Sequence, residues 1–166
     1  MKKKILLTSF STWLPHHQSN SSDDLLDEVS KCQVDRTLTF LRKLPVDSHK
    51  ATSFTLEAIE NIQPHYVICC GMAETRSVLT VESHATQANN MIKTSVNLEN
   101  LINGLSKTKI SHDAGKFVCE SLYYSVLKHL GERHKNKSCI FVHVPLLKPD
   151  NKDLILVDFI NLIHRL

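Results

Sequence analysis

The sequence predicts an α/β domain of three layers, in which helices cover both faces of an open, twisted and largely parallel sheet. Short apolar segments typical of strands alternate along the chain with segments of helical periodicity. Two of the apolar segments, residues 66–70 (YVICC) and 140–144 (IFVHV), lack polar alternation, which is typical of strands buried on both faces. The length of 166 residues suits one core, so we expect a single domain over residues 1–166.

Three further segments are expected as strands. Residues 4–9 (KILLTS) are short and apolar and end in small polar residues. Residues 37–46 carry β-branched and apolar side chains and stop near a proline, although their Leu and Lys residues would also suit a helix. Residues 78–84 (VLTVESH) alternate between apolar and polar, as a strand with one buried face does.

The helices are expected between these strands. A polar loop over residues 11–24 leads to a short helix at 25–32, with Asp23 or Asp24 as its cap. Helical periodicity also marks residues 48–62 before Pro64, the short segment 98–105 and an amphipathic terminal helix at 154–166. The clearest helix is residues 117–130, which we expect Gly131 to end.

Composition excludes several classes of protein. The formal net charge is only +3 and no basic stripe with interleaved aromatics occurs, so no nucleic-acid partner is expected. No segment approaches the ~20 apolar residues of a membrane span, and Thr8 and Ser9 interrupt the only candidate signal sequence. Five irregularly spaced cysteines argue against a disulfide framework and for a reducing, cytoplasmic location. Ten histidines occur without CxxC or HExxH spacing, so no metal is expected.

Cys119 is the first candidate for chemistry. Asp113 to Gly115 form a tight turn before the expected helix, so Cys119 falls in the first helical turn. The positive end of a helix lowers a thiol pKa, and its free N–H groups can bind an oxyanion. The alternative is a small core residue on the apolar face of the helix.

His143 and Glu82 are the second and third candidates. His143 ends an apolar strand, where it could serve as a base or lie hydrogen-bonded at the sheet rim. Glu82 lies in an apolar strand and needs a partner, because burial of an unpaired charge is costly. That partner is either Arg76, in a structural ion pair, or an imidazole that Glu82 orients. His112 is a competing base nearer to Cys119 in sequence.

Three segments resemble signatures of the pyroglutamyl peptidase I family. Residues 71–83 (GMAETRSVLTVES) are similar to the segment around its acidic residue, and residues 111–124 (SHDAGKFVCESLYY) to the segment around its catalytic cysteine, SN-x-AG-x-(Y/F)-(V/L)-CN. Residues 141–147 (FVHVPLL) are similar to its histidine segment, FIHVP. The segments occur in the family's order, and the resemblance covers most of the chain.

The resemblance implies an open α/β fold without metal or cofactor and a role for each candidate residue. Cys119 would be the nucleophile, His143 the general base and Glu82 the residue that orients His143, with Arg76 supporting Glu82 or the oxyanion. The implied reaction removes an amino-terminal pyroglutamyl residue from a blocked peptide through a thioester acyl-enzyme. The family tends to form oligomers, so the resemblance also admits a homo-oligomer.

The substrate pocket departs from the family pattern. The first loop reads SFSTWLPHH where the family has a sequence like GFEPFGG, which leaves Phe10 and Trp13 as candidate apolar walls. GMAETR replaces GQAGGR and places Met72 at the position of the glutamine, and the segment between residues 85 and 94 is shortened. A divergent member that binds a peptide or another partner without turnover is therefore the alternative function.

Overall fold

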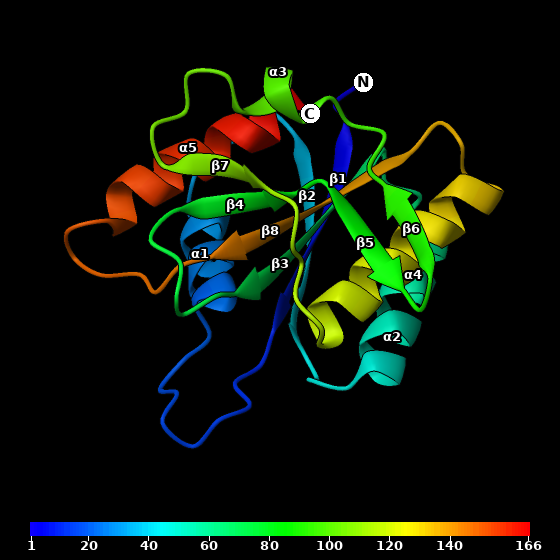
Figure 1. Cartoon of the computed structure of the whole chain (residues 1–166). Coiled ribbons are helices and arrows are strands. Elements are labelled where there is room, and N and C mark those ends of the chain that lie inside the picture. The colour runs from blue at the N-terminus through cyan, green and yellow to red at the C-terminus, as the bar shows by residue number, and fades with distance from the viewer.

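A six-stranded sheet in the order β2–β1–β3–β8–β4–β7 forms the centre of the computed structural model, which describes residues 1–166 (Figure 1). Four strands are parallel, and the remaining two, β4 and β7, run parallel to each other but antiparallel to β8. A separate hairpin is formed by two short strands. The strand bounds are β1 Lys4–Phe10, β2 Thr37–Leu44, β3 Tyr66–Met72, β4 Leu79–Glu82, β5 His84–Gln87, β6 Asn90–Lys93, β7 Thr108–Ser111 and β8 Ser138–Val144.

Helices cover both faces of the sheet, which confirms the predicted three-layer α/β class. Helices α1 (Ser21–Ser30) and α5 (Lys152–Arg165) pack on one face, and α2 (Ser48–Ile62) and α4 (Val118–Arg133) pack on the other (Figure 1). The short helix α3 (Leu98–Ile102) contacts β7 and α5. No helix has both the length and the apolar character needed to cross a membrane.

The core consists of two apolar clusters, one on each side of the sheet. Within β3, Ile68 and Cys70 belong to the cluster under α1 and α5, whereas Val67 and Cys69 belong to the one under α2 and α4. Successive strand residues point to opposite faces, so a strand covered on both sides needs apolar residues at every position. This explains why residues 66–70 and 140–144 show no polar alternation.

Helix ends differ from their predicted positions. Helix α1 begins at Ser21 rather than residue 25, because the Asn20 side chain caps it by accepting a hydrogen bond from the Ser22 N–H. Asp23 and Asp24 lie in its first turn, where carboxylates are also favoured. Helix α4 passes through Gly131 and ends at Arg133, so the predicted stop at Gly131 is wrong. Helical geometry there needs no positive φ, and glycine costs only about 1 kcal/mol relative to alanine.

Short elements account for the other differences. The segment predicted as one strand over 78–84 is divided at Ser83 between β4 and β5, and the helix predicted over 98–105 ends at Ile102. The short strands β6 and β7 were not predicted, because each has only four residues and a largely polar sequence. Residues 37–46 are a strand over Thr37–Leu44 and not a helix, since pairing with β1 decides between the two.

Candidate active site

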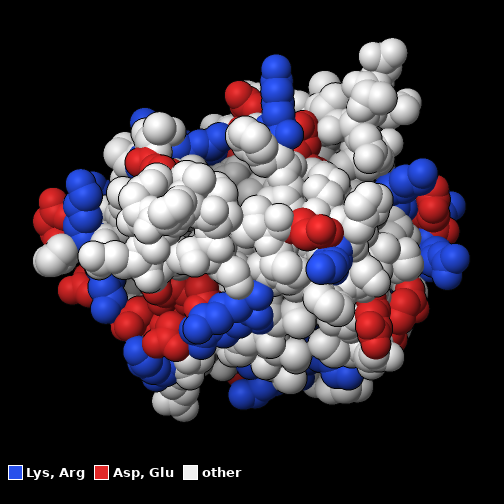
Figure 2. Space-filling model, turned by 90° about the horizontal axis from the view of Figure 1, so that it is seen from below, with Lys and Arg blue, Asp and Glu red and all other residues white.

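The candidate residues gather at the carboxyl ends of β3 and β8, beside the N-terminus of α4. In open α/β sheets this edge is where ligands bind. Figure 2 views the molecule from this side and shows uncharged residues over most of the middle of the face. Charged side chains lie mainly toward its periphery (Figure 2).

The buried Glu82 carboxylate contacts both His143 and Arg76. Its Oε1 lies 2.7 Å from His143 Nδ1 and 2.5 Å from Arg76 Nη1. Glu82 is fully buried and His143 is 6% exposed. The ion pair with Arg76 and the contact with an imidazole were alternatives in the sequence, and the structure contains both. Arg76 also donates from Nη2 to the carbonyl of Asp113 at 2.7 Å, which ties this cluster to the turn before α4.

The protonation of the Glu82–His143 pair follows from this geometry. Burial by itself raises the pKa of the Glu82 carboxyl, but interactions with His143, Ser111 and Arg76, of which the hydrogen bond to His143 is the largest, together outweigh burial and hold the pKa below its ordinary value. Glu82 is therefore a carboxylate at neutral pH and accepts the proton of His143 Nδ1. The other imidazole nitrogen, Nε2, is left to accept a proton from a reacting group.

Cys119 is the second residue of α4 and lies against β3. Gly71 is so close that a Cβ placed on it would lie 2.7 Å from Cys119 Sγ. Gly71 is paired with His143 in the parallel ladder of β3 and β8, and adjacent strands are about 4.8 Å apart. The side chains of paired residues lie on the same face, so the Cys119 thiol and the His143 imidazole share the face that α4 covers.

The environment of Cys119 favours the neutral thiol. Burial, followed by the neighbouring Cys69 and Glu82, raises its pKa to about 12, although Arg76 and the helix backbone act in the opposite direction. The expectation that the helix end lowers this pKa is therefore wrong for the resting protein, because desolvation is the larger effect. A thiolate at Cys119 would therefore have to form by transfer of the thiol proton to another group.

The start of α4 supplies unpaired backbone donors. Helical geometry leaves the first N–H groups of a helix without intrahelical acceptors, and the Ncap residue, Phe117, makes no side-chain cap. These amides adjoin Cys119 and suit an oxyanion. His112, the competing base, instead lies 2.7 Å from the Ser83 hydroxyl and stacks against His84.

The residues expected to bind substrate are not all at the surface. Phe10 is 2% exposed and belongs to the core cluster under α2 and α4. Met72 is 7% exposed, and its sulfur lies 3.3 Å from the Ser21 backbone N–H. Trp13 is 45% exposed, with its ring 4.5 Å from that of His17. Trp13 is thus the only one of the three that offers a substantial exposed surface to a ligand.

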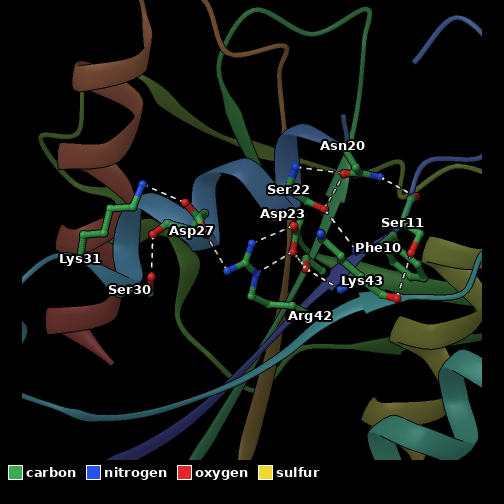
Figure 3. A network of polar contacts seen from close by, with 11 residues as sticks. Phe10, Ser11, Asn20, Ser22, Asp23, Asp27, Ser30, Lys31, Arg42 and Lys43 are labelled. Carbon is green, nitrogen blue, oxygen red and sulfur yellow. Dashed lines mark hydrogen bonds and ion pairs between the residues drawn. The ribbon is translucent and has the colours of Figure 1, made fainter. Parts of the chain in front are cut away.

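A polar network that sequence reasoning missed holds the base of the first loop. Asp23 of α1 accepts hydrogen bonds from Ser9 of β1 and Arg42 of β2, and Ser11 donates to the Lys43 carbonyl (Figure 3). Beside it is a pocket of about 240 Å³ whose lining is almost entirely polar. The only sequence signal was an arginine within a strand and an acidic pair near a helix start.

Two loops that depart from the family pattern contact each other at the rim. His16 and His17 of the first loop lie 3.2 Å and 2.6 Å, through Nε2, from Oε1 of Glu74 in the loop after β3. None of these three residues was a sequence candidate, because they are distant in the chain and match no ligand motif.

The chain is similar to known peptidases in sequence. The family model described as pyroglutamyl peptidase matches residues 3–103 and 92–153. A pyrrolidone-carboxylate peptidase of Oceanobacillus iheyensis is 28% identical over 171 residues, covering 86% of this chain and 84% of the relative. A pyrrolidone-carboxylate peptidase of Brevibacillus brevis is 25% identical, covering 87% of this chain and 79% of the relative.

Solved structures share the fold. The crystal structure of pyroglutamyl peptidase I from Bacillus amyloliquefaciens superposes with a TM-score of 0.86 at 20% identity, covering 99% of this chain and 95% of that one. The pyrrolidone carboxyl peptidase from Thermococcus litoralis gives a TM-score of 0.85 at 20% identity, covering 98% and 92% of the two chains. The arrangement of sheet and helices is therefore the one found in these structures.

Proposed function

The chain belongs to the pyroglutamyl peptidase family, and on this premise we propose that it is a cysteine peptidase that removes an amino-terminal pyroglutamyl residue from peptides. The observation that carries the proposal is the buried Glu82–His143 pair on the sheet face that α4 covers, with Cys119 in the first turn of α4. These residues supply a nucleophile, a base and a group that orients the base.

The first half of the proposed reaction forms a thioester. His143 Nε2 accepts the proton of the Cys119 thiol while the sulfur forms a bond to the pyroglutamyl carbonyl carbon. The N–H groups at the start of α4 stabilise the negative charge on the carbonyl oxygen. The bond from this carbon to the peptide nitrogen then breaks, and His143 donates its proton to the departing amine.

The second half regenerates the thiol. His143 accepts a proton from water, whose oxygen attacks the thioester carbon, and the C–S bond breaks to release pyroglutamate. The proton then returns to Cys119. Glu82 stays ionised throughout, because its lowered pKa keeps it a carboxylate that stabilises the imidazolium.

Hydrolysis of a fluorogenic pyroglutamyl amide by the purified chain tests the proposal. We expect turnover by the wild type and a loss of about a thousandfold or more in Cys119→Ala, because removal of a nucleophile leaves only residual catalysis. Cys32→Ala is the matched control, since Cys32 is a half-buried free thiol beyond the end of α1. It should retain full turnover.

Two results would contradict the proposal. Equal turnover in Cys119→Ala would exclude the thiol as nucleophile. Absence of turnover in a folded wild type would instead favour the alternative, a family member that binds a peptide or partner without cleaving it.

A further inference from the structure

The loop after β1 and the loop after β3 meet in a cluster of three ligand-type side chains. Both Nε2 atoms of the adjacent His16 and His17 point to one oxygen of Glu74. We propose that His16, His17 and Glu74 form a binding site for a divalent transition-metal ion of the zinc class, which clamps the first loop to the loop after β3.

The geometry is close to that of a tetrahedral site. The three ligand atoms all lie within 4.8 Å of one another. Zinc bonds of about 2.0–2.1 Å in a tetrahedron place ligand atoms about 3.3 Å apart. The His16–Glu74 separation of 3.2 Å already fits, and the His17–Glu74 separation of 2.6 Å has to widen by about 0.7 Å.

The donor set is also appropriate. Two imidazoles and a carboxylate are ligands that zinc accepts in proteins, and such a set leaves a fourth position for water. Softer thiolate ligands are not needed. The hydrogen bonds from the two imidazoles to Glu74 already bring all three groups together at the position that the ion would take.

His17 gives the cluster an additional distinguishing feature. Its side chain is only 3% exposed, and its Nδ1 is buried without a hydrogen-bond partner. The ring packs edge-on against Trp13 and His16, at centroid distances of 4.5 Å and 4.3 Å. The only polar contact of this buried imidazole is therefore through Nε2, toward the other two ligands.

A second cluster of the same composition has a simpler explanation. Glu60 Oε1 lies 2.7 Å from His129 and 2.9 Å from His134. Glu60 lies in α2, His129 lies in α4 and His134 is the C-cap of α4, so these contacts join two helices that pack against each other. We therefore assign this cluster to the packing of α2 against α4, and it serves as a control.

A metal ion at the rim would act on the proposed pocket through the backbone. Glu74 lies two residues before Arg76, in a turn held by bonds from the Ala73 N–H to the Val144 carbonyl and from the Arg76 N–H to the Ala73 carbonyl. Arg76 contacts Glu82. The ion would thus connect the loop that carries Trp13 to the turn that carries Arg76, and fix the mouth of the site.

Trp13 provides a local reporter of this site, because it is the only tryptophan in the chain. Co²⁺ is titrated into the Cys119→Ala chain, without a histidine tag, while Trp13 fluorescence and visible absorption are recorded. Removal of Cys119 prevents binding at that thiol and makes the result independent of turnover. We expect quenching that saturates at one equivalent, absorption typical of four-coordinate Co²⁺, and reversal by Zn²⁺.

Glu74→Gln and Glu60→Gln in the same background form a matched pair. In Glu74→Gln, half-maximal quenching of Trp13 should require at least tenfold more Co²⁺. Glu60→Gln should leave this concentration unchanged. His16→Ala should raise it as Glu74→Gln does. Absence of quenching, or equal quenching in Glu74→Gln, would overturn the proposal and leave a hydrogen-bonded cluster only. Circular dichroism confirms that each variant is folded.

Discussion

Gly71 is the point at which the backbone of β3 makes room for the thiol of Cys119. A Cβ at this position would lie 2.7 Å from Cys119 Sγ and 3.0 Å from Cζ of Phe141. The first distance is too short for any real contact, so one of the neighbours would have to move. Because Phe141 is fully buried and packs against His143 at a centroid distance of 4.8 Å, the displacement would fall on Cys119 or on the side chains beside His143.

Gly71→Ala is therefore expected to reduce turnover of a pyroglutamyl amide by about a hundredfold, since a misplacement of about 1 Å costs that much. Overpacking should also lower the free energy of unfolding by about 1–3 kcal/mol. Steady-state kinetics and urea denaturation measure the two effects.

Gly131→Ala is the control for this substitution. Apart from the backbone of α4 itself, no atom lies within 4 Å of a Cβ at Gly131. The free energy of unfolding of Gly131→Ala should therefore rise by up to about 1 kcal/mol, and its turnover should be unchanged. Full turnover in Gly71→Ala would show that the thiol does not react from the position described.

At the scale of elements, α1 is fixed to the edge strand β2 by a partly buried ion pair. Arg42 binds Asp23 in a bidentate manner, with N–O distances of 2.8 Å and 2.9 Å, and also contacts Asp27 (Figure 3). Burial raises the pKa of Asp23, but hydrogen bonds from Arg42 and Ser9 outweigh it and lower the pKa below its ordinary value. The pair therefore stabilises the charged form of Asp23.

Asp23→Asn should lower the free energy of unfolding at pH 7 by about 2–4 kcal/mol, because Arg42 loses its bidentate partner. A depressed carboxyl pKa contributes stability above the unfolded value of about 3.9, and that stability is lost as the pH falls through the folded value. The difference in the free energy of unfolding between the wild type and Asp23→Asn, measured by urea denaturation, should thus become smaller as the pH falls from 5 to 3.

Asp27→Asn is the matched substitution for this ion pair. Asp27 is 43% exposed and makes only one of the contacts of Arg42. Asp27→Asn should therefore lower the free energy of unfolding by less than Asp23→Asn does. An equal decrease in the free energy of unfolding in the two variants would contradict the role given to Asp23. So would a difference between wild type and Asp23→Asn that does not depend on pH.

At the scale of the whole molecule, the interior holds several groups that resist ionisation. Burial raises the pKa of Cys70, of Cys139 and of Tyr123 well above their ordinary values, and that of Cys119 to about 12. A group whose folded pKa is raised contributes stability below its unfolded pKa, and this contribution is lost as the pH rises toward the folded value.

We therefore expect the free energy of unfolding to fall steadily above about pH 8.5, which is the pKa of an unfolded cysteine. Each group contributes at most about 1.4 kcal/mol per pH unit. Urea denaturation at pH 7.5, 9 and 10.5 under reducing conditions measures the fall, and Cys119→Ala should show a shallower one. A stability that stays constant to pH 10.5 would contradict this picture.

The class of fold could be predicted from the sequence, and so could the candidate residues of the site. Unbroken apolar runs at residues 66–70 and 140–144 mark strands buried on both faces, and helical periodicity at 48–62 gives α2 with its observed bounds. These signals are local, because each is a pattern of apolar and polar residues that are neighbours in the sequence. Cys119, His143 and Glu82 were also identifiable, since each lies in a segment with a specific family resemblance.

The way in which distant segments meet could be read only from the folded chain. It reversed β4 against β8, placed Phe10 and Met72 in the interior, and brought His16 and His17 to Glu74. It also raised the pKa of Cys119 where the helix end alone predicted a lower one. Strand order, burial and desolvation depend on contacts between residues far apart in the chain, and no local pattern of residues specifies them.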